Sequence, residues 1–197
     1  MINALIDYSK HEPNDEYYTP DEAVEMIIPF IPGYVKTIWE YTAIKESRIV
    51  KVLRSHGYEV ITSHIDDGKD FLTYEPAENY DIIITNPPFS LKDMFLQRAL
   101  SLKKPFMLLL PITTLEGLKR NKIFRENRIQ LLIPDKRFRF KSEGSGAWFQ
   151  TSWFTHGLGL EKDLNFIALN GSEHHPVFRQ EELKSIMDLY NEIRRAA

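Results

Sequence analysis

The residues best suited to chemistry form one tetrapeptide, Asn86-Pro87-Pro88-Phe89, here called the NPPF segment, which follows an apolar run at 81–85. Neither proline has an N–H to donate, and both favour an extended backbone, so the carbonyl groups there can act as acceptors. The Asn86 amide oxygen and the Pro87 carbonyl could together accept both hydrogens of an exocyclic amino group. The Phe89 ring could stack on a planar heterocycle. A rigid strand-terminating turn is the structural alternative.

An amino group on a purine needs such help because its lone pair is delocalised into the ring, which makes the nitrogen a poor nucleophile. Two acceptors that take both hydrogens raise the electron density on nitrogen and favour its tetrahedral form during attack. Dipoles positioned in this way stabilise the transition state and require no strong general base. The NPPF segment therefore favours chemistry at an aromatic amine.

Alternating strand and helix patterns predict the elements that position this segment. A first helix is expected at Thr19-Pro20-Asp21, with Thr19 as its cap and Pro20 in its first turn. Five strands and three further helices follow: strands at 35–40, 58–63, 81–85, 105–110 and 129–133, and helices at 48–54, 91–102 and 115–127. This alternation predicts an α/β fold with a mostly parallel sheet and helices on both faces. In such a sheet, ligands bind outside the carboxyl ends of the strands, where the NPPF segment lies.

The pattern changes after residue 133. Strand formers recur at 147–154, residues 165–169 are expected to close an antiparallel edge, and residues 181–195 have the pattern of an amphipathic helix. No internal repeat or linker separates these pieces. We therefore expect one domain over residues 1–197, with a core at 15–169 and a C-terminal helix within 170–197.

The composition narrows the class of protein. With 197 residues, 43% of them hydrophobic, the chain is long enough for one substantial core. The absence of cysteine excludes a disulfide framework, a thiolate nucleophile and a Cys-based zinc site, and the adjacent histidines 174 and 175 have no obvious acidic partner, so no metal is expected. No apolar run approaches the roughly 20 residues that span a bilayer, and the first residues lack a signal-peptide pattern. These observations favour a cytoplasmic protein with no membrane partner.

The net charge of −3 hides a one-sided distribution, with acids crowded in the first 25 residues and bases crowded at 119–141. Such clustering is typical of a surface that faces a polyanion, although a solvated helix face and an edge strand guarded by cations would give the same pattern. We expect nucleic-acid contacts from the following residues: Lys119, Arg120, Arg137, Arg139, Lys141 and Trp148.

Aromatic side chains accompany the basic stretch, and two interpretations of them stay open. They could stack on splayed bases beside Arg137 and Arg139, or they could pack as core on one face of a strand. The set comprises Phe138, Phe140, Trp148, Phe149, Trp153 and Phe154.

The motifs together resemble the adenine-N6 methyltransferases, whose signature is [DNS]-P-P-[YFW], and above all the small phage- and prophage-type members. Residues 16–20 (EYYTP) are similar to the N-terminal element that touches the cofactor in that family. Residues 38–40 (IWE) resemble the first strand with its acidic end, and residues 68–72 (GKDFL) resemble the segment whose aspartate contacts the cofactor's adenine. Residues 145–149 and 153–158 also resemble C-terminal pieces of the phage proteins. The order of the motifs resembles the gamma arrangement of DNA methyltransferases.

This resemblance implies a Rossmann-like class I methyltransferase fold and methyl transfer from S-adenosylmethionine to the N6 amino group of adenine in nucleic acid, DNA more than RNA. It implies catalytic roles for Asn86, Pro87, Pro88 and Phe89, and cofactor binding by Tyr18, Thr19, Pro20, Glu40, Asp70 and Phe71. A duplex target would require the adenine to be flipped out of the base stack. Because the chain has little room for a separate recognition domain, we expect modest sequence specificity, or help from a second copy or a protein partner.

Two departures from the family pattern keep other hypotheses open. Family members have a glycine-rich loop after the first strand, because glycine lets the backbone approach the cofactor closely, whereas this chain has YTAIKES at 41–47. His64 stands where an acid usually holds the ribose hydroxyls. One alternative is a methyltransferase-like protein without catalysis that binds nucleic acid, a nucleotide or a host defence component. Another is the same fold acting on a different amine, such as a protein glutamine or a free nucleotide.

Overall fold

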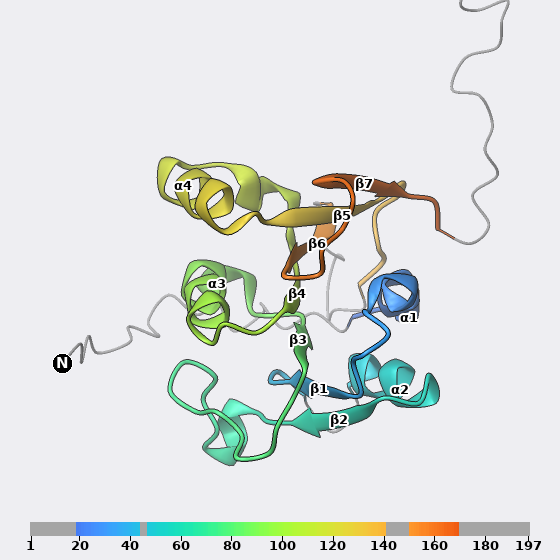
Figure 1. Ribbon diagram of the computed structural model, residues 1–197, viewed down its shortest axis with the longest axis vertical. Helices are drawn as coiled ribbons and strands as arrows, with labels where there is room; N and C mark the ends of the chain where they lie inside the picture. Colours follow the sequence, from blue (N-terminus) through green and yellow to red (C-terminus); the bar gives the residue numbers. More distant parts are fainter. Residues whose placement is uncertain (1–18, 44–46, 141–149, 170–197) are drawn as a thin grey trace, which may run out of the picture.

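The computed structural model describes residues 19–43, 47–140 and 150–169, and is built around one seven-stranded sheet (Figure 1). The order of the strands is β2-β1-β3-β4-β6-β5-β7. Their bounds are β1 Thr37–Glu40, β2 Glu59–Thr62, β3 Ile82–Thr85, β4 Phe106–Pro111, β5 Gln130–Pro134, β6 Thr151–His156 and β7 Leu164–Ile167. The α-helices are α1 Asp21–Glu25, α2 Arg48–Ser55, α3 Lys92–Ser101 and α4 Leu118–Asn127. Short 3₁₀ helices are η2 Ile28–Phe30, η3 Ile65–Asp67, η4 Phe89–Leu91 and η5 Ile112–Leu115.

The sheet is mostly parallel, and helices cover both of its faces. The pairs β1–β2, β1–β3, β3–β4 and β5–β7 are parallel, and only β6 runs against its neighbours among the described strands. Figure 1 shows α1 and α2 on one side of the sheet and α3 and α4 on the other. All residues of β3 and β4 are buried, as expected for strands covered on both faces. The predicted α/β fold is confirmed.

The winding of the chain reverses between β1 and β3. From β1 the chain passes through α2 to β2 on one side, and from β3 it passes through α3 to β4 on the other. The connections that leave the carboxyl ends of these two neighbouring strands therefore diverge to opposite faces. A parallel sheet binds ligands at such a point.

The C-terminal part of the described chain adds the antiparallel strand and the outer edge. The antiparallel strand expected in this region is confirmed in β6, which lies between β4 and β5. The strand expected to be antiparallel at 165–169 is instead β7, which runs parallel to β5 at the outermost position. The reason is the turn after β6, which reverses the chain and carries it past β5. This turn needs glycine at Gly157, where φ is +74° and a Cβ atom would lie 3.3 Å from the Cα atom of Pro105.

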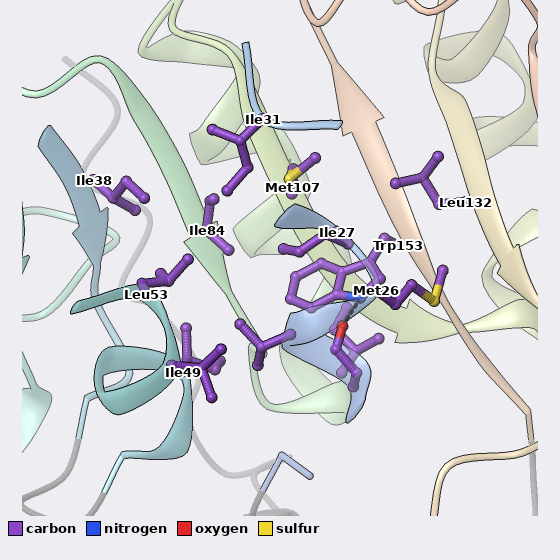
Figure 2. Close-up of a cluster of buried hydrophobic side chains, with 14 of the residues drawn as sticks. Met26, Ile27, Ile31, Ile38, Ile49, Leu53, Ile84, Met107, Leu132 and Trp153 are labelled. Carbon is purple, nitrogen blue, oxygen red and sulfur yellow. Dashed lines mark hydrogen bonds between the residues drawn. The ribbon is translucent and has the colours of Figure 1, made fainter. Parts of the chain in front are cut away.

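Two hydrophobic clusters hold the helices to the sheet. Figure 2 shows the cluster on the α1 and α2 side, which contains Ile27, Leu53, Ile84 and the fully buried Trp153, with Ile27 beside the Trp153 ring. The indole Nε1 of Trp153 donates to the carbonyl oxygen of Ala23, at 2.8 Å, and so ties β6 to α1. The second cluster covers the α3 and α4 side and is rich in aromatic rings.

The described aromatic residues of the C-terminal region belong to these clusters and not to an exposed stacking surface. Phe138, Phe140 and Trp153 pack in the cluster beneath α1, and Phe154 packs in the other. All four are buried, so the core interpretation is confirmed for them. Phe138 and Phe140 reach the core from a segment without regular secondary structure, outside the sheet.

Several expectations lie outside the described residues: the roles of Tyr18, Lys141, Trp148 and Phe149, the histidines at 174 and 175, and the helix at 181–195. In the described parts of the chain, no helix combines the length and the apolar character needed to cross a membrane.

Candidate active site

The NPPF segment lies at the carboxyl end of β3, in the middle of the sheet. Thr85, the last residue of β3, is fully buried, and Phe89 begins η4, which leads into α3. Glu40 ends the neighbouring strand β1. The predicted catalytic residues and the predicted acidic strand end are therefore brought to the same edge of the sheet.

Thr19 contacts the NPPF segment directly. The amide Nδ2 of Asn86 donates to the hydroxyl Oγ1 of Thr19, at 3.1 Å, across 67 positions of sequence. Because Nδ2 donates, the oxygen Oδ1 is the atom of this side chain that can accept from an amine. The expected helix cap is wrong: Pro20 is the N-cap of α1, and no side chain caps that helix. The Thr19 hydroxyl is engaged by Asn86 instead.

Glu40 is fully buried and organises the loop that follows β1. Its Oε1 atom accepts from the backbone N of Thr42 at 3.0 Å and lies 2.7 Å and 2.8 Å from the hydroxyls of Thr42 and Thr85. Its Oε2 atom accepts from the Ser47 hydroxyl at 3.4 Å. Burial raises the pKa of the Glu40 carboxyl, and these hydrogen bonds partly offset the rise. Oε1 is thus committed to the protein, and Oε2 is the atom better placed for a ligand.

Tyr41 occupies the next position and was missed as a site residue by the sequence reasoning. Its ring stacks on Phe71, with centroids 3.5 Å apart and planes inclined by 15°. Phe95 and Trp39 flank the pair, at centroid distances of 5.4 Å and 5.8 Å from Tyr41. The signal available in the sequence was an aromatic residue where the family has its glycine-rich loop.

The Tyr41 hydroxyl is buried and has no hydrogen-bond partner among the described residues. Burial raises the pKa of Tyr41 well above its usual value, and the nearby Glu40 charge adds to the rise. The hydroxyl is therefore neutral at any physiological pH, and its burial is unfavourable.

Asp70 and Phe71 lie in a turn that α3 supports. The Oδ1 atom of Asp70 accepts from the backbone N of Leu72 at 3.0 Å. The Arg98 guanidinium, on α3, donates to the carbonyl oxygens of Phe71 and Tyr74 at 3.2 Å and 3.3 Å. The helix that follows the NPPF segment thus also holds the predicted adenine-contacting turn in place.

His64, which replaces the expected acid after β2, has a local role. Its Nδ1 atom accepts from the backbone N of Asp66 at 3.2 Å and caps η3.

The described basic residues differ in how far they are exposed. Lys119, Arg137 and Arg139 are exposed. Arg120 is partly buried and is committed to its own surroundings: its Nε atom donates to the carbonyl oxygens of Thr114 and Glu116 at 2.8 Å and 2.7 Å, and its Nη1 atom donates to Asp93 at 3.0 Å. Arg120 therefore ties the start of α4 to the first turn of α3.

Comparison with known proteins identifies the fold. No protein-family model and no characterised protein sequence matches the chain. A solved structure from Listeria monocytogenes, described as a class I S-adenosylmethionine-dependent methyltransferase, matches with a TM-score of 0.53 and 12% identity over 90% of this chain and 71% of its own. The chain therefore has the class I methyltransferase fold, and the predicted fold class is confirmed.

Two further structures overlap less closely. A modification subunit of a type I restriction enzyme from Vibrio vulnificus YJ016 has a TM-score of 0.45 and 12% identity, over 94% of this chain and 55% of its own. The 23S rRNA methyltransferase ErmE has a TM-score of 0.47 and 10% identity, over 68% and 67% of the two chains.

Proposed function

We propose that this protein transfers a methyl group from S-adenosylmethionine to the exocyclic N6 amino group of adenine in nucleic acid, with DNA preferred over RNA. The observation that carries the proposal is the Asn86–Thr19 hydrogen bond at the end of β3. It fixes the Asn86 amide at the carboxyl edge of a methyltransferase fold, with its accepting atom assigned to Oδ1.

The NPPF segment acts on the amine through hydrogen bonding. Asn86 Oδ1 and the Pro87 carbonyl each accept one amine hydrogen, which raises the electron density on nitrogen as it attacks. Phe89 stacks on the base and holds its plane. Glu40 does not serve as a base in this scheme, because polarising the amine requires no strong general base. Its Oε1 atom is committed to Thr42 and Thr85.

The residues around the switch between β1 and β3 fit the cofactor on one condition. Thr19 accepts a hydrogen bond from Asn86 of the NPPF segment, and Phe71, next to Asp70, stacks on Tyr41 directly after β1. Tyr18 and Pro20 flank Thr19 in the sequence. When bound, S-adenosylmethionine supplies an electrophilic methyl group. Phe71 can stack on its adenine ring only if Tyr41 leaves the face of Phe71 that it now covers.

Lys119, Arg137 and Arg139 are proposed to hold phosphates together with Lys141, and Trp148 is proposed as a further nucleic-acid contact. The exposed positions of the first three suit this role. A second copy of the chain or a protein partner would extend this surface.

The Tyr41–Phe71 stack also favours a second candidate, a methyltransferase-like binding protein without turnover. A protein that no longer uses the cofactor could keep an aromatic residue such as Tyr41 in the loop where the cofactor would bind. Its NPPF segment would still bind a purine.

Calorimetry followed by mass spectrometry separates the two candidates. The full chain is titrated with S-adenosylmethionine and S-adenosylhomocysteine, and DNA and RNA incubated with S-adenosylmethionine are digested and analysed for N6-methyladenine. Micromolar cofactor binding that Asp70→Ala weakens, with N6-methyladenine that Asn86→Ala abolishes, supports the enzyme. Asn127→Ala, on the far end of α4, is the matched control and should leave both signals unchanged.

No heat with either ligand, with and without DNA, would contradict the enzyme and leave the binding protein. Cofactor binding with methylation of free nucleotides or peptides only would contradict the assignment of nucleic acid as substrate.

A further inference from the structure

Tyr41 stands at the point where the winding of the sheet reverses. Tyr41 directly follows Glu40, the last paired residue of β1. One of the two strands that pair with β1 is β3, which leads into the NPPF segment. The Tyr41 ring lies parallel to that of Phe71 at 3.5 Å, which is the spacing of two stacked planar rings. A heteroaromatic ring stacked on the same face of Phe71 would take the same space.

The hydroxyl group of Tyr41 is not needed to fill the space that its ring occupies. Tyr41 is only 2% exposed, and its hydroxyl is buried without a partner among the described residues. A phenylalanine would fill the same space without that unfavourable burial. The hydroxyl therefore weakens the closed arrangement and favours a state in which it reaches water or a ligand.

We propose that Tyr41 is a displaceable cover over Phe71: a ligand's planar heteroaromatic ring binds on the face of Phe71 that Tyr41 occupies, and binding requires the tyrosine ring to move away. This inference rests on the proposed function, since the adenine of S-adenosylmethionine is the ring expected there. It explains how a chain with an aromatic residue in place of a glycine-rich loop can still admit a cofactor.

Two substitutions at one position must then act in opposite directions. Tyr41→Phe removes the unpaired hydroxyl and stabilises the cover, so the melting temperature rises and affinity for adenosine and S-adenosylhomocysteine falls about tenfold. Tyr41→Ala removes the cover, so the protein is less stable and yet binds both ligands about tenfold more tightly. Calorimetry and urea unfolding measure the two effects separately.

The double variant Tyr41→Ala with Phe71→Leu tests whether the affinity gained by Tyr41→Ala depends on the Phe71 ring. Affinity gained by Tyr41→Ala should disappear in the double variant. Tyr80→Phe is the matched control, because Tyr80 also packs on Trp39, with ring centroids 5.1 Å apart, but its hydroxyl donates to Glu75 and so has a partner that the Tyr41 hydroxyl lacks among the described residues. It should leave both affinities unchanged.

A direct readout uses the full chain in solution. Proton–proton Overhauser contacts between the Tyr41 and Phe71 rings should be present without ligand and lost when S-adenosylhomocysteine is added. If Tyr41→Ala weakens binding as Phe71→Leu does, Tyr41 is a ligand contact and the cover is refuted, while cofactor binding stands. If the wild type and all Tyr41 variants fail to bind, the cofactor proposal fails as well. Binding by Tyr41→Ala alone would show a cover that stays closed.

Discussion

At the scale of single residues, the side chains of the candidate site hold one another in place through hydrogen bonds. Asn86 is oriented by Thr19, and Glu40 gathers Thr42 and Thr85 around one oxygen. The sequence predicted Asn86, Thr19 and Glu40 as site residues, because each belongs to a motif or a strand end. It did not predict that Thr42 and Thr85 would share the carboxylate, since side chains 43 positions apart are paired only by the fold.

The first prediction concerns pH and Glu40. A carboxyl whose pKa is raised by folding contributes stability below its unfolded value of about 4.5, and that contribution is lost as the pH rises through the folded value. Relative to Glu40→Gln, the wild type should therefore lose free energy of unfolding as the pH rises above about 4.5. Urea unfolding of both proteins between pH 4 and about 8 measures the difference.

Glu59→Gln, at the exposed start of β2, is the control and should track the wild type over the same range. A Glu40→Gln curve parallel to that of the wild type would show that burial does not raise this pKa.

The second prediction concerns Asn86 and Thr19. Thr19→Val keeps the shape of the side chain but removes the acceptor, so the partly buried Asn86 amide loses this hydrogen bond and is held less firmly. We expect a loss of about 1 kcal/mol in the free energy of unfolding and a larger loss in methyl transfer than in cofactor affinity. Thr19→Ser, which keeps the hydroxyl, should restore transfer, whereas equal losses in Thr19→Val and Thr19→Ser would argue against an orienting role.

At the scale of elements, α3 and α4 position the site from one side of the sheet. Arg98 on α3 holds the Phe71 turn, and Arg120 ties the start of α4 to Asp93 on α3. The sequence predicted both helices from their periodicity and placed the first part of the basic stretch, which spans 119–141, on the second of them. It could not separate the cations that support the fold from those that face outward, because both kinds have the same residue types.

The third prediction separates these two kinds of cation. Arg120→Met should lower the free energy of unfolding by about 1–2 kcal/mol, because two carbonyl groups and Asp93 lose their donor. Lys119→Ala should leave stability unchanged but weaken nucleic-acid binding and reduce the salt slope of log K by about one. Lys162→Ala, in the turn before β7, should change neither quantity; an equal loss of binding would show that the surface has been misplaced.

At the scale of the whole molecule, the two hydrophobic clusters pack the helices on both faces of one sheet, and this sheet carries the candidate site at the ends of β1 and β3. The class of the fold could be predicted, because alternating strands and helices leave few arrangements for a parallel sheet. The insertion of β6 between β4 and β5 could not be predicted, because it depends on the pairing of β4 with β6, which are separated in the sequence by α4 and β5.

The fourth prediction follows from the bond between Trp153 and Ala23. Trp153→Phe leaves a cavity beneath α1 and an unsatisfied carbonyl group, so it should lower the free energy of unfolding by about 2–4 kcal/mol. Because α1 follows Thr19, cofactor affinity should fall under conditions in which the protein is still folded. Leu132→Ala, in the same cluster but with an apolar side chain that cannot hydrogen-bond to α1, should lower stability without that extra loss of affinity.

The position of β6 has a consequence for synthesis of the chain. The ribosome makes β5 before β6, yet β5 joins the rest of the sheet through β6. Until residue 156 has emerged, the outer edge of β4 and both edges of β5 have no native strand to pair with. Unpaired strand edges can pair with those of other growing chains. The interval in which residues 130–156 are translated is therefore the one in which a chaperone would matter most.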